Sequence, residues 1–186
     1  MKIIGITGSI SSGKTTVANL LASKKYPLFS ADLVVSSLYK KKNFNKVLIE
    51  KFKLKSKKKI KDQIKLILKK NKNDLYKLET IIHPFVREKM IKFLKKKNKL
   101  LFLEVPLLIE SKLNKYFDNL IYVGASKKLR LKRYLQKKNK KETFILLDKR
   151  QLSASYKKKF CDHIINNNYS LEVLRKNVKK LMERYE

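Results

Sequence analysis

The stretch GSISSGKTT, residues 8–16, is the clearest indication of the fold of this chain and holds two of its only four glycines. Small residues ahead of Gly-Lys-Thr let a backbone fold closely around phosphate with its N–H groups turned inward. Before it, KIIGIT (2–7) is apolar and β-branched, as a buried strand is. After it, TTVANLLASKK (15–25) has apolar residues at helical spacing and a lysine-rich end. The order strand, loop, helix is the context in which such a loop binds nucleotide phosphate rather than forming a plain glycine turn.

Two residues of the loop have side chains suited to phosphoryl chemistry. In this motif the lysine, here Lys14, reaches the β- and γ-phosphates, and the hydroxyl of the next residue, Thr15, ligates Mg²⁺. The loop indicates a nucleotide but no particular reaction. A GTPase would carry Asn-Lys-x-Asp on a later strand, and the Asn-Lys-Lys-Glu at 139–142 is only a near miss. A chain of 186 residues is short for a helicase-type core, so a small kinase fits best.

Charge and composition limit the partners that we expect. The formal net charge is +33, which suggests nucleic acid, but 42 of the 48 basic residues are lysines spread along the chain. Base recognition draws on the planar fork of arginine, so we favour a general lysine bias and expect no specific nucleic-acid partner. The rare arginines hint at bidentate binding of phosphate or carboxylate, with chance as an equal alternative for each. They are Arg87, Arg130, Arg133, Arg150, Arg175 and Arg184.

The sequence also carries an expectation about location. No run of about 18 apolar residues occurs, so we expect no membrane span. The apolar run at the N-terminus is too short for a signal peptide, and the single Cys161 cannot form an internal disulfide. We therefore expect a cytoplasmic protein, either a monomer or a small homo-oligomer.

The chain around Asp32 is expected to form a second strand. The stretch YPLFSADLVV (26–35) is interpreted as a short strand, and it ends in Ser30-Ala31-Asp32. A carboxylate at the carboxyl end of a strand faces the ligand crevice of an open α/β sheet. Asp32 is thus a candidate general base for a hydroxyl acceptor, with capping of the following helix as the alternative.

The middle of the chain, residues 36–97, is expected to be helical and to form an acceptor pocket. Within it stands His83-Pro84-Phe85-Val86-Arg87. Because proline favours the first turn of a helix, we expect a helix to begin at Pro84, with His83 beside its N-cap. Simple capping or packing is an equal alternative role for His83. The expected helices cover 43–53, 60–70, 73–81 and 84–97.

Three further strands and a basic helical segment complete the pattern. KLLFLEVPLLIES (99–111) is the longest apolar run, and its Glu104 would be costly to bury unless it has a partner such as Mg²⁺ or a water of Mg²⁺. FDNLIYVGAS (117–126) and CDHIINNN (161–168) are also expected to be strands, and an amphipathic helix follows the second. Residues 127–158 are helical and basic, as a lid that closes over phosphates is.

In this order the motifs resemble those of the dephospho-coenzyme A kinase family over nearly the whole chain. The resemblance is carried by ITGSISSGKTTVA, SADLV, IIHPFVREKM, LEVPLLIES, FDNLIYVGAS with LRLKR, RQLS and CDHIINNN. It implies an α/β P-loop kinase fold with a five-stranded parallel sheet. The core would be about 1–32, 98–126 and 159–186, the helical acceptor-binding insertion about 33–97 and the lid about 127–158.

The resemblance also implies an activity and a set of site residues. The family transfers the γ-phosphoryl group of ATP, with Mg²⁺, to the ribose 3′-hydroxyl of dephospho-coenzyme A. The catalytic residues would be Lys14, Asp32 and Arg133. Residues expected to bind ATP are Ser11, Ser12, Gly13, Lys14, Thr15, Thr16, Arg133 and Arg150. Residues expected to line the acceptor site are Asp32, His83, Pro84, Arg87, Pro106, Leu107 and Leu108. Thr15 and Glu104 would hold the metal, Glu104 directly or through water.

Several positions depart from the family pattern. Ser9 and Ser11 stand where glycine is common, and a serine forced to positive φ costs ~1 kcal/mol. Ser30 replaces the first acid of an Asp-Ala-Asp motif, and Glu104 replaces an aspartate. Since Lys14, Thr15 and Asp32 are kept, we expect an active enzyme.

Two other functions stay open from the residues alone. A nucleoside or nucleoside-monophosphate kinase would share the loop, core and lid but would use a different acceptor. A basic nucleic-acid-binding ATPase would show turnover stimulated by DNA or RNA. The full motif order argues against both.

Overall fold

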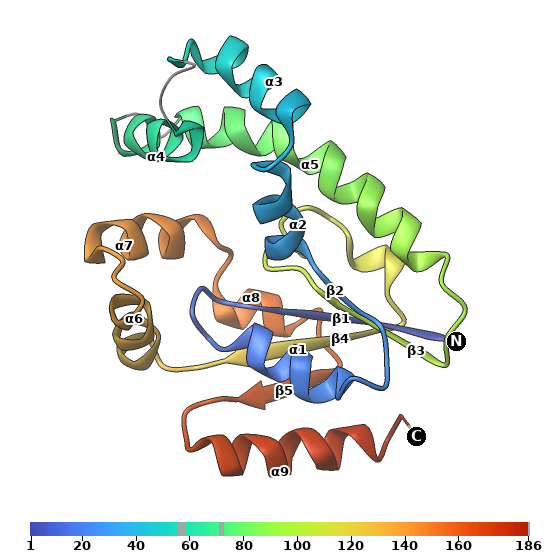
Figure 1. The fold of residues 1–186 in the computed structure, drawn as a ribbon. Helices are drawn as coiled ribbons and strands as arrows, with labels where there is room; N and C mark the ends of the chain where they lie inside the picture. The colour runs from blue at the N-terminus through green and yellow to red at the C-terminus, as the bar shows by residue number, and fades with distance from the viewer. Residues whose placement is uncertain (56–58, 71–72, 186) are drawn as a thin grey trace. The chain divides into compact units, whose positions relative to one another are not determined.

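The computed structural model describes residues 1–55, 59–70 and 73–185, and it divides into two compact units (Figure 1). The first unit joins Met1–Ser30 with Lys96–Glu186, and the second is Ala31–Lys95. The insertion expected at 33–97 includes residues 56–58 and 71–72, which lie outside the described residues.

A parallel sheet of five strands forms the centre of the first unit, in the order β2-β3-β1-β4-β5. The predicted five-stranded parallel sheet is therefore confirmed. β2 and β3 lie on one side of β1, and β4 and β5 lie on the other, so the strand order reverses at β1. Ligands of such sheets bind outside the carboxyl ends of the strands at this reversal. The strands are β1 (Lys2–Gly8), β2 (Leu28–Ser30), β3 (Leu100–Glu104), β4 (Asn119–Gly124) and β5 (His163–Asn166).

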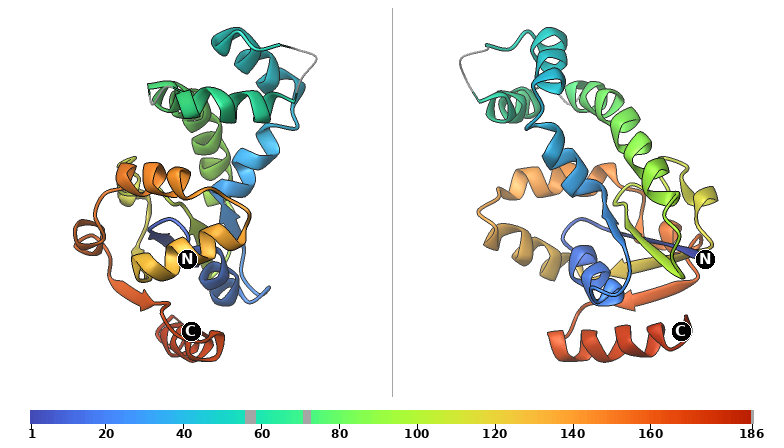
Figure 2. Two further views of the ribbon diagram at one scale, coloured as in Figure 1. Left: turned by 90° about the vertical axis from the view of Figure 1, so that its left-hand side faces the viewer. Right: turned by 45° about the vertical axis from the view of Figure 1, so that its right-hand side comes forward.

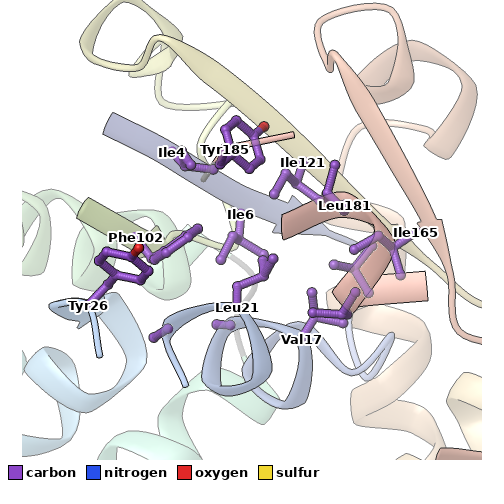
Figure 3. Close-up of a cluster of buried hydrophobic side chains, with 14 of the residues drawn as sticks. Ile4, Ile6, Val17, Leu21, Tyr26, Phe102, Ile121, Ile165, Leu181 and Tyr185 are labelled. Carbon is purple, nitrogen blue, oxygen red and sulfur yellow. The ribbon is translucent and has the colours of Figure 1, made fainter. Parts of the chain in front are cut away.

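Helices pack on this sheet through a continuous apolar core. α1 and α9 lie together along one face in both views of Figure 2, and Figure 3 shows Ile6, Val17 and Leu21 meeting Leu181 between them. α6 and α7 pack on each other, and α8 packs against β4. The helices of this unit are α1 (Lys14–Ala22), α6 (Lys127–Gln136), α7 (Lys141–Arg150), α8 (Ala154–Lys158) and α9 (Leu171–Met182), with a short 3-10 helix at Asn114–Tyr116.

The described residues of the second unit form four helices around an apolar cluster of their own. The helices are α2 (Ala31–Leu38), α3 (Lys42–Phe52), α4 (Ile60–Lys70) and α5 (Asn73–Leu94). The buried members of the cluster are Leu38, Phe44, Leu48, Leu54, Ile64, Leu78 and Ile82. Among the described residues of the chain, no helix is both long and apolar enough to cross a membrane.

The strand expected at 26–35 is wrong in its second half. β2 ends at Ser30 and α2 begins at Ala31, so Asp32 lies in the first turn of a helix and not at the end of a strand. Ala31 and Leu38 are the buried residues of α2, seven positions and therefore two helical turns apart. An acidic residue in the first turn also interacts favourably with the helix dipole.

The helix boundary expected at Pro84 is also wrong. α5 runs without interruption from Asn73 to Leu94, so His83 lies in the helix interior and not beside an N-cap. Apolar residues four apart, Leu78, Ile82, Val86 and Met90, continue across the proline; three are buried, and Val86 packs against the cluster. Burying this stripe offsets the backbone hydrogen bond that the proline removes.

The other three expected strands are shorter than the apolar runs that predicted them. β3 stops at Glu104, and the chain turns at Val105-Pro106 where proline offers no N–H for a ladder. β4 and β5 keep only the residues paired in the sheet, 119–124 and 163–166. Their ends beyond the sheet are loops that carry polar groups.

Candidate active site

The carboxyl ends of four strands bring the candidate residues of the first unit together. The loop of residues 8–16 follows β1, Ser30 ends β2, Glu104 ends β3, and Asn167 follows β5. We call this set the carboxyl edge. Since all five strands are parallel, these ends lie on the same edge of the sheet.

Three positive φ angles shape the loop after β1. Gly8 has φ 151° and Gly13 has φ 94°, and a Cβ on Gly13 would lie 2.2 Å from Nδ2 of Asn167. Ser11 has φ 56°, in the left-handed region that costs a residue with a Cβ about 1 kcal/mol or more. Ser11 therefore has the positive φ that makes serine a costly replacement for glycine. Ser9 does not have positive φ, and its hydroxyl lies 3.1 Å from that of Tyr122.

Lys14 and the start of α1 give the loop its positive character. Lys14 is the first residue of α1, and its side chain is buried with Nζ donating to the carbonyl of Ser9 at 3.0 Å. The first N–H groups of a helix have no partner within the helix and carry partial positive charge. The Ser12 hydroxyl is also buried and has no hydrogen-bond partner among the described residues. A lysine, a helix N-terminus and an unsatisfied hydroxyl in one loop form a site that suits an anion.

Glu104 is held between two hydroxyl groups. It is only 1% exposed, and it accepts from Thr15 Oγ1 at 2.6 Å through Oε1 and from Ser30 Oγ at 3.0 Å through Oε2. The β2–β3 register places Ser30 directly beside Glu104. A buried carboxyl group is costly without hydrogen bonds, and these two donors reduce that cost. Ser30, which replaces an acid of the family pattern, is thus a donor to the acid on the next strand.

Arg133 reaches the loop from α6. Its Nη2 donates to the carbonyl of Asn167 at 3.0 Å and its Nη1 to the carbonyl of Ser12 at 3.4 Å. Asn167 Nδ2 donates to the same Ser12 carbonyl at 2.9 Å. Burial lowers the pKa of the Arg133 guanidinium from its ordinary value, but an arginine keeps its charge at neutral pH. A positive group is therefore fixed against the loop.

The remaining predicted residues of the first unit lie around this edge. Thr16 is exposed in the first turn of α1, and Arg150 ends α7 with an exposed side chain. The carbonyl of Pro106 accepts from Thr7 Oγ1 at 3.2 Å, Leu107 is half-buried, and Leu108 is fully buried beneath Gly5.

Four predicted residues belong to the second unit. Asp32 is exposed in the first turn of α2. His83, Pro84 and Arg87 are exposed on α5, with His83 and Arg87 one turn apart. The structure thus brings the loop, Glu104 and Arg133 together in one unit and presents the other four on the helices of the second.

Three residues at the carboxyl edge were missed by the sequence reasoning as site residues. Asn167 fixes the Ser12 carbonyl, Gln151 accepts from the N–H of Ile10 at 2.8 Å, and Arg130 donates to the carbonyl of Ile10 at 3.3 Å. The rarity of arginine was a signal for Arg130. Gln151 belongs to the RQLS motif of the family resemblance, but the motif does not show its partner, because the contact with Ile10 joins positions 141 residues apart.

Solved structures first define the class of protein. A crystal structure of TT1252 from Thermus thermophilus matches with a TM-score of 0.80, 28% identity and coverage of 98% of this chain and 97% of that chain. The dephospho-CoA kinase from Campylobacter jejuni matches with a TM-score of 0.67, 27% identity and coverage of 100% and 97%. Shikimate kinase from Acinetobacter baumannii shares the fold, with a TM-score of 0.57, 14% identity and coverage of 99% and 92%. Fold and loop together are those of a P-loop kinase.

Sequence comparisons then identify the family. A model of the dephospho-CoA kinase family matches residues 2–172. Dephospho-CoA kinases from Fusobacterium nucleatum and Bartonella henselae are each 36% identical, over 191 and 185 residues, and the alignments cover 97% and 96% of this chain and 97% and 95% of those proteins. The chain belongs to the dephospho-CoA kinase family, which catalyses the last step of coenzyme A biosynthesis. The resemblance seen in the motifs is confirmed.

Proposed function

We propose that this chain transfers the γ-phosphoryl group of ATP to the ribose 3′-hydroxyl of dephospho-coenzyme A. The observation that carries the proposal is the convergence of Lys14, the N-terminus of α1 and Arg133 on one loop at the carboxyl edge, in a chain of this family. Phosphoryl transfer depends on positioning and positive charge more than on covalent chemistry, and this edge supplies both.

The loop would hold the phosphates of ATP. N–H groups of Ser11–Thr16 bind phosphate oxygens, and the Ser12 hydroxyl, buried without a partner among the described residues, gains one. Lys14 exchanges the Ser9 carbonyl for the β- and γ-phosphates. Arg133 and Arg150 add positive charge from the helices 127–158, whose role as a lid stays a prediction.

Thr15 and Glu104 fit a magnesium ion. A hydroxyl and a carboxyl oxygen already lie 2.6 Å apart, and Mg²⁺ prefers oxygen ligands while keeping several waters. With one carboxyl group there, waters and phosphate oxygens would complete the shell. Bound at this place, the ion would neutralise charge on the phosphates.

On the acceptor side, Asp32 would orient the 3′-hydroxyl and take its proton. The acceptor oxygen then bonds to the γ-phosphorus as the bond from that phosphorus to the bridging oxygen breaks, and ADP leaves. Asp32 is two residues beyond Ser30, so the covalent chain alone holds their Cα atoms within about 7 Å. The residues proposed to line the acceptor site are His83, Pro84, Arg87, Pro106, Leu107 and Leu108.

The proposed setting is the cytoplasm, supported by the single Cys161, which is a free thiol. A monomer or a small homo-oligomer fits this function equally.

An acceptor panel with Mg-ATP tests the proposal. ADP release and product mass are followed with dephospho-coenzyme A, nucleosides, nucleoside monophosphates and single-stranded DNA or RNA, with Lys14→Ala in parallel. We expect a gain of one phosphate on dephospho-coenzyme A alone, lost in Lys14→Ala. Transfer to a nucleoside monophosphate instead, or hydrolysis stimulated by nucleic acid without transfer, would contradict the proposal.

A further inference from the structure

Two residues of the segment 127–158 form hydrogen bonds with the backbone of Ile10, one with its N–H group and one with its carbonyl group. The N–H of Ile10 donates to Gln151 Oε1 at 2.8 Å, and its carbonyl accepts from Arg130 Nη1 at 3.3 Å. We call Gln151 and Arg130 the Ile10 clamp. Both residues are more than a hundred positions away from Ile10 along the chain. The contacts therefore fix the loop against α6 and the end of α7 rather than against its own strand.

The Arg130 half of the clamp is rigid. Arg130 is 8% exposed, its Nη1 lies 2.5 Å from Asp148 Oδ1, and its Nε donates to the Ala125 carbonyl at 3.2 Å. The guanidinium carbon lies 5.6 Å from the centroid of the Phe144 ring, a cation–π contact. These contacts hold the charged end, the Nε and the flat face of the Arg130 side chain. The side chain therefore keeps a fixed position and can hold the Ile10 carbonyl in place.

Both halves of the clamp depend on α7. Asp148 lies in the last turn of α7, and Gln151 follows directly after its final residue. α7 thus reaches the Ile10 N–H through Gln151 and the Ile10 carbonyl through the Asp148–Arg130 pair. A shift of this helix end would act on both groups together.

The next residue along the loop explains why such a clamp is needed. Ser11 has φ 56°, a left-handed conformation that disfavours residues with a Cβ by about five- to thirtyfold. Glycine adopts it readily. On the other side of Ser11, the Ser12 carbonyl is held by Asn167 and Arg133. Strained residues persist where the surrounding structure over-determines them, and Ser11 lies between two such anchored residues.

We infer that Arg130 and Gln151 are positioning residues that hold Ser11 in its left-handed conformation and so keep the loop in the shape that binds phosphate. The inference rests on the proposed use of this loop for ATP and extends it to two residues that contact no substrate. In this chain the clamp supplies the conformation that glycine at position 11 would supply without help.

A double-mutant cycle with Ser11→Gly tests the inference. The dissociation constant of Mg-ATP is measured by titration calorimetry for wild type, Gln151→Ala, Ser11→Gly and the double variant. We expect Gln151→Ala to raise the dissociation constant about fivefold when Ser11 is present and less than twofold when Ser11→Gly is also present, because glycine needs no clamp. A purely structural role for Gln151 predicts the same factor in both backgrounds, and that result would overturn the inference.

Two matched variants keep the test decisive. Gln151→Glu retains an acceptor oxygen for the Ile10 N–H and should stay within about twofold of wild type. If Gln151→Ala unfolds, Gln151→Met takes its place in the cycle, because methionine has a similar length but lacks the amide oxygen. Gln136→Ala removes the same type of side chain from an exposed position at the end of α6 and should change nothing. A loss for Gln151→Glu as large as for Gln151→Ala, or no effect of Gln151→Ala on the dissociation constant, would contradict the clamp.

The readout separates this inference from the proposed function. ATP binding is measured without any acceptor, so a wild-type protein that binds Mg-ATP but phosphorylates another acceptor would refute the proposed function and still test the clamp. A wild-type protein that binds no nucleotide would overturn both.

Discussion

The carboxyl edge of the sheet and the helical unit Ala31–Lys95 carry their candidate residues in opposite ways. At the edge the groups are mainly buried and polar, and they are held by hydrogen bonds between residues far apart in sequence, such as Thr15 with Glu104. In the helical unit the candidates Asp32, His83 and Arg87 are exposed, and the helices are held together by an apolar cluster beneath them. One region depends on polar geometry and the other on hydrophobic burial.

Because of this difference, substitutions in the two regions should affect different properties of the protein. A change at the edge should act on the proposed nucleotide contacts or on residues that shape the loop, with little loss of apolar burial. A change inside the helical cluster removes buried carbon and should lower stability first. A change on the exposed face of the helices should leave the fold intact and act only on the acceptor.

The largest expected effects compare one residue from each region. Lys14→Ala should lower kcat/KM by about a hundred- to a thousandfold and weaken ATP binding, since it removes a charge from the phosphates. Asp32→Asn should lower kcat by about a hundred- to ten-thousandfold while ATP binding stays unchanged, since it removes a proton acceptor. Steady-state kinetics and ATP titration measure both.

Thermal unfolding of both variants serves as the control. Neither should lower the midpoint by more than a few degrees. If Asp32→Asn weakened ATP binding, the two regions would not divide into one for the phosphoryl donor and one for the acceptor.

A smaller effect is expected from a substitution in the apolar cluster of the helical unit. Leu48 is fully buried there, and Leu48→Ala should lower the free energy of unfolding by about 2–5 kcal/mol. The acceptor KM should rise as this unit loosens, while ATP binding by the first unit is retained. Denaturant unfolding and ATP titration of the same sample measure the two effects.

Leu66→Ala is the matched control, because Leu66 is 58% exposed on α4. It should cost well under 1 kcal/mol. If Leu48→Ala weakened ATP binding as strongly as it lowered stability, the two regions would not be separable.

Sequence patterns identified much of the edge but few of its contacts. The loop motif and the apolar runs predicted the sheet, and Glu104 was expected to have a partner because a lone acid in a strand is costly to bury. That Ser30 is a partner depends on which strand lies beside β3, and register is a tertiary property. Gln151 was missed for the same reason. Local patterns carry no information on pairs so far apart along the chain.

The helical unit was misread where two local rules conflicted. Proline at 84 predicted a helix start, whereas the apolar residues at 78, 82, 86 and 90 run through it on one face. The stripe prevailed because burial of several side chains outweighs one lost hydrogen bond. At Asp32 the stretch 26–35 was expected to be a strand, but α2 begins at Ala31, directly after the sheet pairing of β2 ends.

A third prediction concerns the hydroxyl donor to Glu104. Ser30→Ala leaves the Oε2 side of a buried carboxyl group without that donor and should lower the free energy of unfolding by about 1–3 kcal/mol. The concentration of Mg²⁺ needed for half-maximal activity should also rise, because Glu104 is less well fixed. Ser30→Thr keeps a hydroxyl and is the matched variant. An equal shift in Mg²⁺ dependence for Ser30→Thr and Ser30→Ala would mean that the hydroxyl does not position Glu104.

The smallest expected effect has opposite signs for stability and function. Pro84 lies inside α5, where proline lacks the N–H that would donate to the carbonyl of residue 80. An interior proline costs a helix about 3 kcal/mol, and we expect Pro84→Ala to regain on the order of 1 kcal/mol of that after relaxation of the helix. If Pro84 lines the acceptor site, the same variant should raise the KM for dephospho-coenzyme A a few-fold and leave the ATP dissociation constant unchanged.

Paired measurement of stability and acceptor KM decides between two roles for this proline. Lys89→Ala, an exposed change later in the same helix, is the control for helix propensity and should alter neither quantity. A stabilised Pro84→Ala with an unchanged acceptor KM would mean that the proline only bends or weakens α5. A stabilised variant with a raised KM would mean that the helical unit keeps a costly residue for the acceptor, as we propose that the carboxyl edge keeps Ser11 in a costly conformation for the donor.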